Sequence, residues 1–133
     1  GLLPDFMWVD EQGARVADPD TIESKYDGAY SYNACRLPYN LVQSKDKTSQ
    51  QLVKKMLNFF KSQRNLYAGY DLKGKALNNH QAASFFAPIV YASEHEKGYL
   101  KLVQQNKYIF TQDLPLNNYY DATMTTMIAL ELF

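Results

Sequence analysis

Apolar residues recur at helical spacing through most of the chain after residue 33. The clearest stripe combines Leu52, Val53, Met56, Leu57 and Phe60, and lysines and glutamines occupy the opposite face. This pattern predicts an amphipathic helix that buries one side. A short hydroxyl side chain at its start can accept a hydrogen bond from the first turn, so the expected N-cap is one of two residues, Thr48 or Ser49.

Four more segments show the same spacing. Pro38 is compatible with a helix only in its opening turn, so the first helix should begin close to Ala34 or Cys35. The third is apolar almost all round, which predicts burial on most sides, and Pro88 should bend it. The alternation of apolar and amphipathic segments predicts antiparallel helical hairpins. The four predicted helices span approximately residues 33–44, 81–93, 94–106 and 118–133.

The N-terminal part lacks helical periodicity. Apolar residues 6–9 and Arg15-Val16 flank the turn residues 10–13, which predicts a small β-hairpin. Asp18-Pro19 and its neighbours then predict an extended loop. We therefore divide the expected single, partial domain of residues 1–133 into a loop-rich head, residues 1–27, and a helical body, residues 28–133. Within the body, residues 69–75 predict a turn or short hairpin.

Composition excludes several functions. The 133 residues carry 14 Lys+Arg and 14 Asp+Glu, so the formal net charge is zero and no electrostatic attraction for nucleic acid is expected. No apolar run is long enough for a membrane span, and no signal peptide is visible at the start. Cys35 is the single cysteine and is expected to be a small core residue. His80 and His95 are isolated, so neither a metal site nor a cofactor is expected.

Tyrosine is unusually common, with 11 residues, and the segment 26–39 combines several of them with amide, hydroxyl and arginine side chains. Aromatic rings with a polar edge bind with little loss of side-chain entropy, and their flat faces suit sugar rings. The segment is therefore a better candidate for carbohydrate than for nucleotide or metal. The alternative is that these tyrosines pack in the core, as aromatic residues at helical spacing commonly do.

Three motifs carry a resemblance to a known family. Residues 32–38 resemble the Tyr-Asp-Ala-x-Arg-x-Pro signature of glycoside hydrolase family 8, which comprises inverting endoglucanases, chitosanases, lichenases and xylanases. Residues 69–74 are similar to the family's Gly-Tyr-x-x-x-Gly loop, and 81–88 to its Ala-Pro helix. Residues 118–121 resemble the start of its last barrel helix. The resemblance implies a mainly α fold, the C-terminal half of an (α/α)6 toroid.

The resemblance also implies an activity and a set of site residues. The activity is inverting hydrolysis of a β-linked polysaccharide or oligosaccharide, in an extracellular or cell-surface protein. The family's usual general base is an aspartate at the position of Asn33, and an amide cannot accept a proton from water near neutral pH. One branch of the family places a glutamate in the preceding loop, which makes Glu23 the candidate base and Asn33 its partner. A solvated loop charge is the alternative for Glu23. Lesser candidates for the base are Asp18, Asp20 and Asp27.

The family's general acid lies in an N-terminal half that no segment here matches. Inverting hydrolysis needs two carboxyl groups roughly 6.5–9.5 Å apart, so the 133 residues alone are expected to be inactive. Two further hypotheses stay open. One is a degenerate family member that binds carbohydrate without cleaving it, and the other is a helical scaffold whose tyrosines only pack.

Six residues are candidates for substrate binding. Arg36 lies on the same helix face as Asn33 and could pair with Glu23, or form a structural ion pair instead. Trp8, the single tryptophan, is either a stacking platform or a buried anchor. The other four lie where loops enter helices: Tyr30, Tyr32, Tyr119 and Tyr120. Half a toroid would leave the apolar faces of residues 82–90 and 123–130 open, so the expected partners are the missing N-terminal half or a second copy of the chain.

Overall fold

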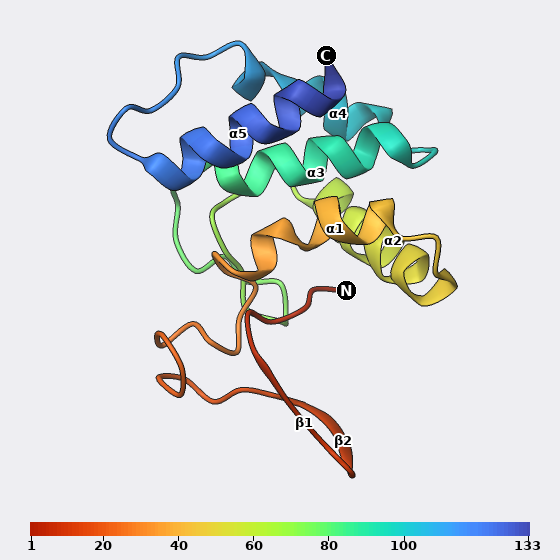
Figure 1. Ribbon diagram of the computed structural model, residues 1–133, viewed down its shortest axis with the longest axis vertical. Helices are drawn as coiled ribbons and strands as arrows, with labels where there is room; N and C mark the ends of the chain where they lie inside the picture. The colour runs from red at the N-terminus through yellow and green to blue at the C-terminus, as the bar shows by residue number, and fades with distance from the viewer.

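The computed structural model describes residues 1–133 as a two-stranded sheet followed by a stack of helices (Figure 1). None of these helices combines the length and apolarity needed to cross a bilayer. The strands are β1 (Met7–Asp10) and β2 (Gly13–Val16). The helices are the 3-10 helix η1 (Ala34–Arg36), α1 (Leu37–Gln43), α2 (Lys47–Ser62), α3 (Ala83–His95), α4 (Leu100–Asn106), the 3-10 helix η2 (Lys107–Phe110) and α5 (Tyr119–Leu132).

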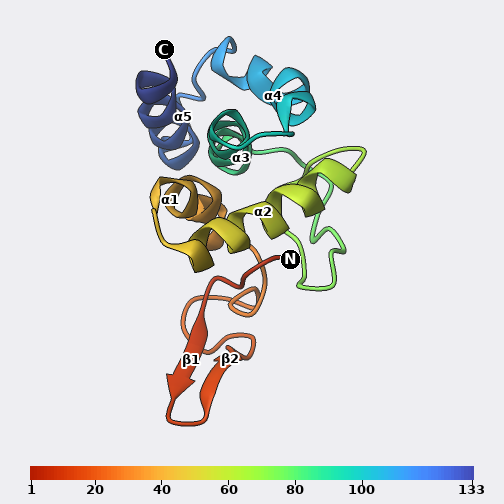
Figure 2. The ribbon, with the colours of Figure 1, turned by 90° about the vertical axis from the view of Figure 1, so that its right-hand side faces the viewer.

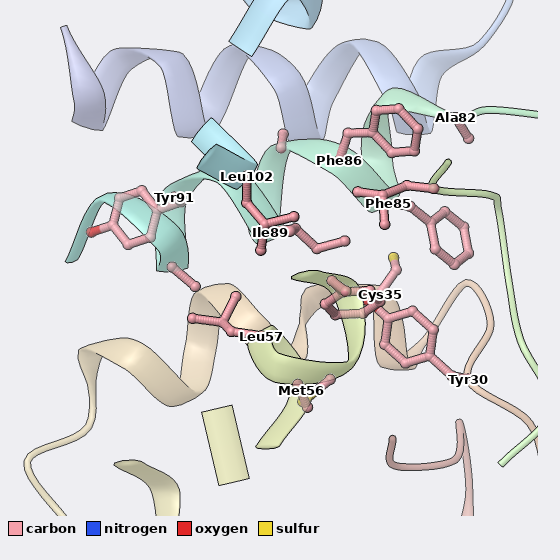
Figure 3. Packing of buried hydrophobic residues seen from close by; sticks show 14 of the residues in the cluster. Tyr30, Cys35, Met56, Leu57, Ala82, Phe85, Phe86, Ile89, Tyr91 and Leu102 are labelled. Carbon is pink, nitrogen blue, oxygen red and sulfur yellow. The ribbon is translucent and has the colours of Figure 1, made fainter. Parts of the chain in front are cut away.

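Helix α3 is the centre of the body. In Figure 2, α5 and α4 lie on either side of it, and α1 and α2 lie beneath. Ten consecutive α3 residues, 84–93, are buried, as the apolar sequence predicts. Figure 3 shows Phe85 and Ile89 of α3 on the side that faces Leu57, Cys35 and Tyr30, whereas the Phe86 ring lies on the opposite side of the helix. The apolar helix is thus buried on most sides, as predicted.

Helix α2 follows its predicted stripe, with Val53, Met56, Leu57 and Phe60 buried. The predicted cap was wrong by two or three residues. Asp46 is the N-cap, and its carboxylate accepts a hydrogen bond from the Ser49 backbone N–H at 2.8 Å. A carboxylate also interacts favourably with the positive end of the helix dipole, which a hydroxyl does not.

The predicted boundary between the third and fourth helices was also wrong. Helix α3 continues to His95, and α4 begins only at Leu100. Gly98 between them has a φ of +97°, a conformation that glycine adopts without strain and that ends the helical path. The first and fifth predicted helices are confirmed: η1 begins at Ala34 and leads into α1, and α5 begins at Tyr119.

The predicted hairpin of the head is confirmed. Strands β1 and β2 are antiparallel, with Met7 opposite Val16 and Asp10 opposite Gly13. The Asp10 side chain accepts a hydrogen bond from the Gln12 backbone N–H at 2.8 Å, and Gly13 takes a positive φ of +120°. The hairpin projects away from the helices as an arm (Figure 1), and every residue of both strands is exposed.

The predicted fold class, a mainly α half of an (α/α)6 toroid, requires correction. Only about half of the residues lie in helices, α1 and α4 have just seven residues each, and no α-helix precedes Leu37. A toroid half would also leave its inner helices open on one side. The predicted open face of 82–90 does not exist, because four helices enclose α3. On α5, by contrast, Thr123, Met127 and Leu130 are exposed.

Candidate functional site

The loop that carries Glu23 is organised by one buried carboxylate. Asp27 accepts hydrogen bonds from the backbone N–H groups of four consecutive residues, 21 to 24, at 2.6–3.2 Å. Its side chain is fully buried. Four donors on one carboxylate hold the loop in a single tight turn, and this turn directs Glu23 outward to the exposed surface.

The electrostatics of Asp27 follow from this arrangement. Burial alone would raise the pKa of the Asp27 carboxyl, but the backbone donors of Ile22, Ser24, Glu23 and Thr21 outweigh burial and lower the pKa below its ordinary value. Asp27 is therefore ionised near neutral pH, and both of its carboxylate oxygens already accept hydrogen bonds from the backbone. It was a lesser candidate for the base, and its position shows a positioning role instead.

A second carboxylate of the head positions the start of η1. Asp5 Oδ1 accepts hydrogen bonds from the backbone N–H groups of Ser31 at 2.8 Å and Ala34 at 2.7 Å. Burial raises the pKa of Asp5, and the hydrogen bonds from this turn oppose the rise. Asp5 thus ties the head to the turn that presents Tyr32 and Asn33.

The two turns bring the predicted catalytic pair together. Asn33 Nδ2 donates a hydrogen bond to Glu23 Oε2 at 2.8 Å. Arg36 Nη2 donates to Asn33 Oδ1 at 3.2 Å, and Arg36 Nε donates to the Asn33 backbone carbonyl at 3.3 Å. Arg36 therefore fixes the amide so that its NH2 group faces Glu23. The considered ion pair between Arg36 and Glu23 is absent, because the only ion pair within 4.0 Å is Lys54–Glu96.

Two of the predicted tyrosines lie next to this group. Tyr32 is 43 % exposed, and its ring meets Phe85 edge-on at 5.0 Å and Tyr120 at 6.2 Å between ring centroids. The Tyr120 hydroxyl donates to the Tyr32 backbone carbonyl at 2.9 Å. Burial and the nearby Asp121 carboxylate raise the pKa of Tyr32, so its hydroxyl stays protonated. Tyr32 offers a supported, half-exposed aromatic surface, and Tyr120 positions it.

Cys35 lies beneath these tyrosines in the core. Its Sγ contacts the Tyr32 carbonyl oxygen at 3.2 Å and the Tyr120 hydroxyl at 3.5 Å. Burial raises the pKa of the Cys35 thiol to about 12, which removes the reactive thiolate at neutral pH. The prediction that Cys35 is a core residue is confirmed.

Tyr30 does not belong to the site surface. Its side chain has no exposed area and packs against Phe60 at 5.6 Å and Phe85 at 5.8 Å between ring centroids. Its predicted role in substrate binding is corrected, because a ring without accessible surface cannot contact a sugar. Tyr30 instead follows the alternative interpretation, in which the tyrosine packs in the core. The spacing of the tyrosines did not separate Tyr30, which points inward, from Tyr32, which points outward.

The remaining aromatic candidates lie apart from the Glu23–Asn33–Arg36 group. Trp8 is on the projecting β1 strand, where Arg15 lies over its ring at 5.7 Å from the centroid. Tyr119 begins α5 and is 83 % exposed, at one end of a surface hollow that includes Met127 and Leu130. Both rings are accessible, so their role in substrate binding stays a prediction.

The other carboxylates near the site accept backbone hydrogen bonds or lie outside the Glu23–Asn33–Arg36 hydrogen-bonded chain. Asp121 is buried and accepts a hydrogen bond from the Ser84 backbone N–H at 3.1 Å, at the start of α3. Asp18 and Asp20 lie on the exposed turn before Thr21, and Asp20 has a φ of +56°. Glu23 is thus the carboxylate of this cluster with an oxygen, Oε1, that no group of the chain contacts.

Sequence reasoning missed the residues that build this geometry. Asp5 contacts backbone groups 26 and 29 residues away, and no local pattern indicates such a contact. Asp27 could have been found, because an aspartate that follows a short polar segment commonly accepts hydrogen bonds from that segment's backbone.

Known proteins similar to this chain include two glucanases, and no family model matches the chain. A β-glucanase from Niallia circulans is 30% identical over 97 residues, which is 66% of this chain and 24% of that protein. The structure of the β-1,3-1,4-glucanase from Paenibacillus sp. X4, in its apo state, matches with a TM-score of 0.87 at 20% identity. That match covers 98% of this chain and 37% of the glucanase. The chain spans about a quarter to a third of the relatives' length.

These findings replace the predicted family assignment. Because the relatives found are β-glucanases, the assignment to glycoside hydrolase family 8 is withdrawn, together with the toroid half and the inverting course that it implied. The motifs behind it have local structural reasons: Gly69 and Gly74 have positive φ values, and the Ala-Pro segment is buried inside α3. Such short motifs do not specify a family. What the comparisons establish is that this chain has the fold of part of a β-1,3-1,4-glucanase chain.

Proposed function

We propose that this chain is part of a glycoside hydrolase that cleaves a β-glucan, and that Glu23 is a catalytic carboxylate of that enzyme. The observation that carries the proposal is the Glu23–Asn33–Arg36 hydrogen-bonded chain beside the half-exposed Tyr32. The relatives named as β-glucanases support the substrate class.

In this proposal Glu23 removes a proton from water, a step that glycoside hydrolysis requires whether the anomeric configuration is inverted or retained. Its Oε2 is held by Asn33, which leaves Oε1 free to accept a proton from a water molecule that attacks the anomeric carbon. Asn33 can orient Glu23 because Arg36 fixes the amide in turn. Asp27 and Asp5 are positioning residues, since each holds the backbone of one of the two turns.

Tyr32 is the proposed contact for a glucose ring. An aromatic face covers the C–H face of a sugar, and its hydroxyl can pair with a sugar hydroxyl. Phe85 and Tyr120 support the ring from behind, so little side-chain freedom is lost on binding. Arg36 is exposed at the same place and can donate to a sugar hydroxyl with the N–H groups that Asn33 does not use.

A second carboxyl group is needed for glycoside hydrolysis, and Glu23 is the free one in this cluster. We therefore assign the second carboxyl group to the part of the enzyme that corresponds to the remaining length of the relatives. The exposed apolar side of α5, with Met127 and Leu130, is the surface we expect that part to cover.

The test is Glu23→Gln in the full-length enzyme, assayed on mixed-linkage β-1,3-1,4-glucan. Loss of a general base lowers the rate by about 10²–10⁴-fold, and the amide preserves the shape of the side chain. The expected result is a fall in kcat of that size with KM nearly unchanged. Glu11→Gln, which removes an exposed glutamate at the tip of the β1–β2 hairpin, is the matched control and should leave kcat unchanged.

Wild-type turnover in Glu23→Gln would end the catalytic assignment. If instead the wild-type enzyme releases no sugar from the glucan, a second candidate function applies, namely binding of β-glucan without cleavage, which the amide at position 33 favours. In that case the protein should still bind glucan oligosaccharides, and Tyr32→Ala should weaken binding. The anomer released in an active enzyme, followed by NMR, independently shows whether hydrolysis inverts or retains.

A further inference from the structure

A second hollow lies in the body, away from the Glu23–Asn33–Arg36 group. It has a volume of about 320 Å³ and is formed where the end of α2 and residues 63–66 meet Gln81, α4 and η2. No head residue lines it, and neither does any residue proposed above for catalysis or glucan binding. The volume lies at the lower end of the range of about 300–1,000 Å³ for ligand sites, which suits one or two small rings.

The lining has an apolar floor and a polar rim. Phe60, Leu66 and Leu102 form the floor and are buried. The rim consists mainly of amide side chains, which offer donors and acceptors side by side: Gln63, Asn65, Gln81 and Gln105. Arg64 is the only charged residue, and no carboxylate is present.

Asn106 offers the hollow an acceptor of fixed orientation. The residue is only 8 % exposed and lines the hollow. Its Nδ2 donates to the Leu102 backbone carbonyl at 2.8 Å, which fixes the amide, while no donor of the chain reaches its Oδ1. This oxygen is therefore a fixed acceptor that a donor from outside the chain can use.

Part of the rim is already held in place. The Gln81 carboxamide oxygen accepts a hydrogen bond from the Tyr108 hydroxyl at 3.2 Å, and its Nε2 lies 3.5 Å from the Leu66 carbonyl oxygen. Asn65 and Gln105 make no side-chain hydrogen bonds within the chain, so their donors and acceptors are free for a ligand. Preorganised groups lose less entropy on binding.

We propose that this hollow is a second carbohydrate site, which binds a glucose unit of a β-glucan separately from the Glu23 cluster. A sugar ring has an apolar C–H face that can lie against the exposed ring of Tyr108, which also lines the hollow, and a rim of hydroxyls that matches the amides. One hydroxyl would donate to Asn106 Oδ1. The absence of acidic groups and the single arginine exclude a cationic ligand and fit a neutral one. The identity of the sugar rests on the proposed function.

The test is an NMR titration of the full chain with cellotriose and with a mixed-linkage β-1,3-1,4-linked trisaccharide. Side-chain amides have their own NH2 signals, so the rim reports binding directly. The expected result is a saturable shift of the Gln105 and Asn106 side-chain signals. Gln105→Ala should weaken this binding about tenfold or more. Gln104→Ala removes the neighbouring amide of α4, which does not line the hollow, and should leave the binding unchanged.

The same titration separates this inference from the proposed function, because Asn33 also has a side-chain amide. Shifts at Gln105 and Asn106 that persist in Tyr32→Ala support the second site, whether or not Asn33 responds. Shifts at Asn33 alone would overturn the second site and leave the proposed function standing. Equal weakening by Gln104→Ala and Gln105→Ala, or equal binding of the α-linked maltotriose, would also overturn it.

Discussion

The head and the body of this chain are held together by different forces. All 22 residues of the hydrophobic core cluster belong to the body, whereas the head buries only Pro4, Ala17 and Asp27. The head is held by hydrogen bonds instead, through Asp27 to its own loop and through Asp5 to the turn of the body. The proposed catalytic residue Glu23 is on the side that lacks a core.

This difference predicts how far the effect of a substitution extends in each region. Core packing is shared among many residues, so the loss of one side chain lowers the stability of the whole body. The geometry of the head depends on a few carboxylate oxygens, so the loss of one should disorder a single loop and affect function before stability. Substitutions in the two regions should therefore separate global stability from the order of the site.

The largest effect on stability is expected in the body. Phe86 of α3 is 1 % exposed, and Phe86→Ala should lower the free energy of unfolding by about 3–5 kcal/mol, since it removes apolar contacts and leaves a cavity. Urea unfolding followed by circular dichroism measures the change. Phe133→Ala is the matched control, because Phe133 is 89 % exposed. Similar losses in both variants would contradict the assignment of the core.

Sequence patterns predicted the individual helices and strands well, because these elements arise from local periodicity and turn residues. The stripe of α2, the start of η1 after Asn33 and the β1–β2 hairpin all follow from neighbouring residues. The end of α3 was misplaced because residues 93–98 include no apolar residue, so apolar spacing cannot mark the boundary, which lies where Glu96 becomes extended and Gly98 takes a positive φ. Helical spacing predicts which segments form helices, but it does not show how the helices pack together. The toroid assignment failed for this reason.

The site was only partly predictable. The proximity of Glu23 to Asn33 was predicted through a family resemblance and is confirmed as geometry, while their roles stay proposals. The pairing of Arg36 with Asn33 rather than Glu23 depends on side-chain geometry that spacing does not contain. Asp5 acts across 26 residues and is invisible to any local pattern. The hydrogen bonds that organise the head are thus the part that the sequence reveals least.

The next effect in size is expected at Asp27 in the head. Asp27→Asn keeps the shape, but it removes the charge and replaces one acceptor oxygen with an NH2 group that faces backbone donors. Amide hydrogen exchange at Thr21, Ile22 and Ser24 should accelerate by on the order of tenfold, because bonds to a charged acceptor are the stronger ones. Exchange in α2 and α3 should stay unchanged. Acceleration in the body would show that the head is not a separate unit.

Acid should also accelerate amide exchange selectively in the Thr21–Ser24 loop of the wild-type chain. Burial opposes the charge of Asp27, but the backbone donors prevail and lower its pKa below the ordinary 3.8. The stabilisation is therefore complete above that value and is lost as the pH falls through the lower, folded-state pKa. Asp5 has a raised pKa because of burial, so its protonation favours the folded state and partly offsets the loss. Asp27→Asn should remove the acid-dependent acceleration of exchange in the Thr21–Ser24 loop.

The smallest effect is expected for a single oxygen inside the core. Tyr30 and Tyr70 are both buried tyrosines of the body, and their backbones pair with each other. The Tyr70 hydroxyl accepts a hydrogen bond from the Tyr67 backbone N–H at 2.8 Å, whereas the Tyr30 hydroxyl has no partner.

Removing a buried hydroxyl that is already unpaired leaves no new unpaired group, so Tyr30→Phe should be neutral or raise the free energy of unfolding by up to about 1 kcal/mol. Tyr70→Phe removes the acceptor of the Tyr67 N–H and should lower the free energy of unfolding by about 1–3 kcal/mol. Thermal and urea unfolding of the two variants measure this contrast, and Tyr30→Phe should leave glucan binding unchanged. If Tyr30→Phe lowered the free energy of unfolding more than Tyr70→Phe did, the Tyr30 hydroxyl would have a hydrogen-bond partner in solution. Tyr30 could then not be described as a residue that makes only apolar contacts.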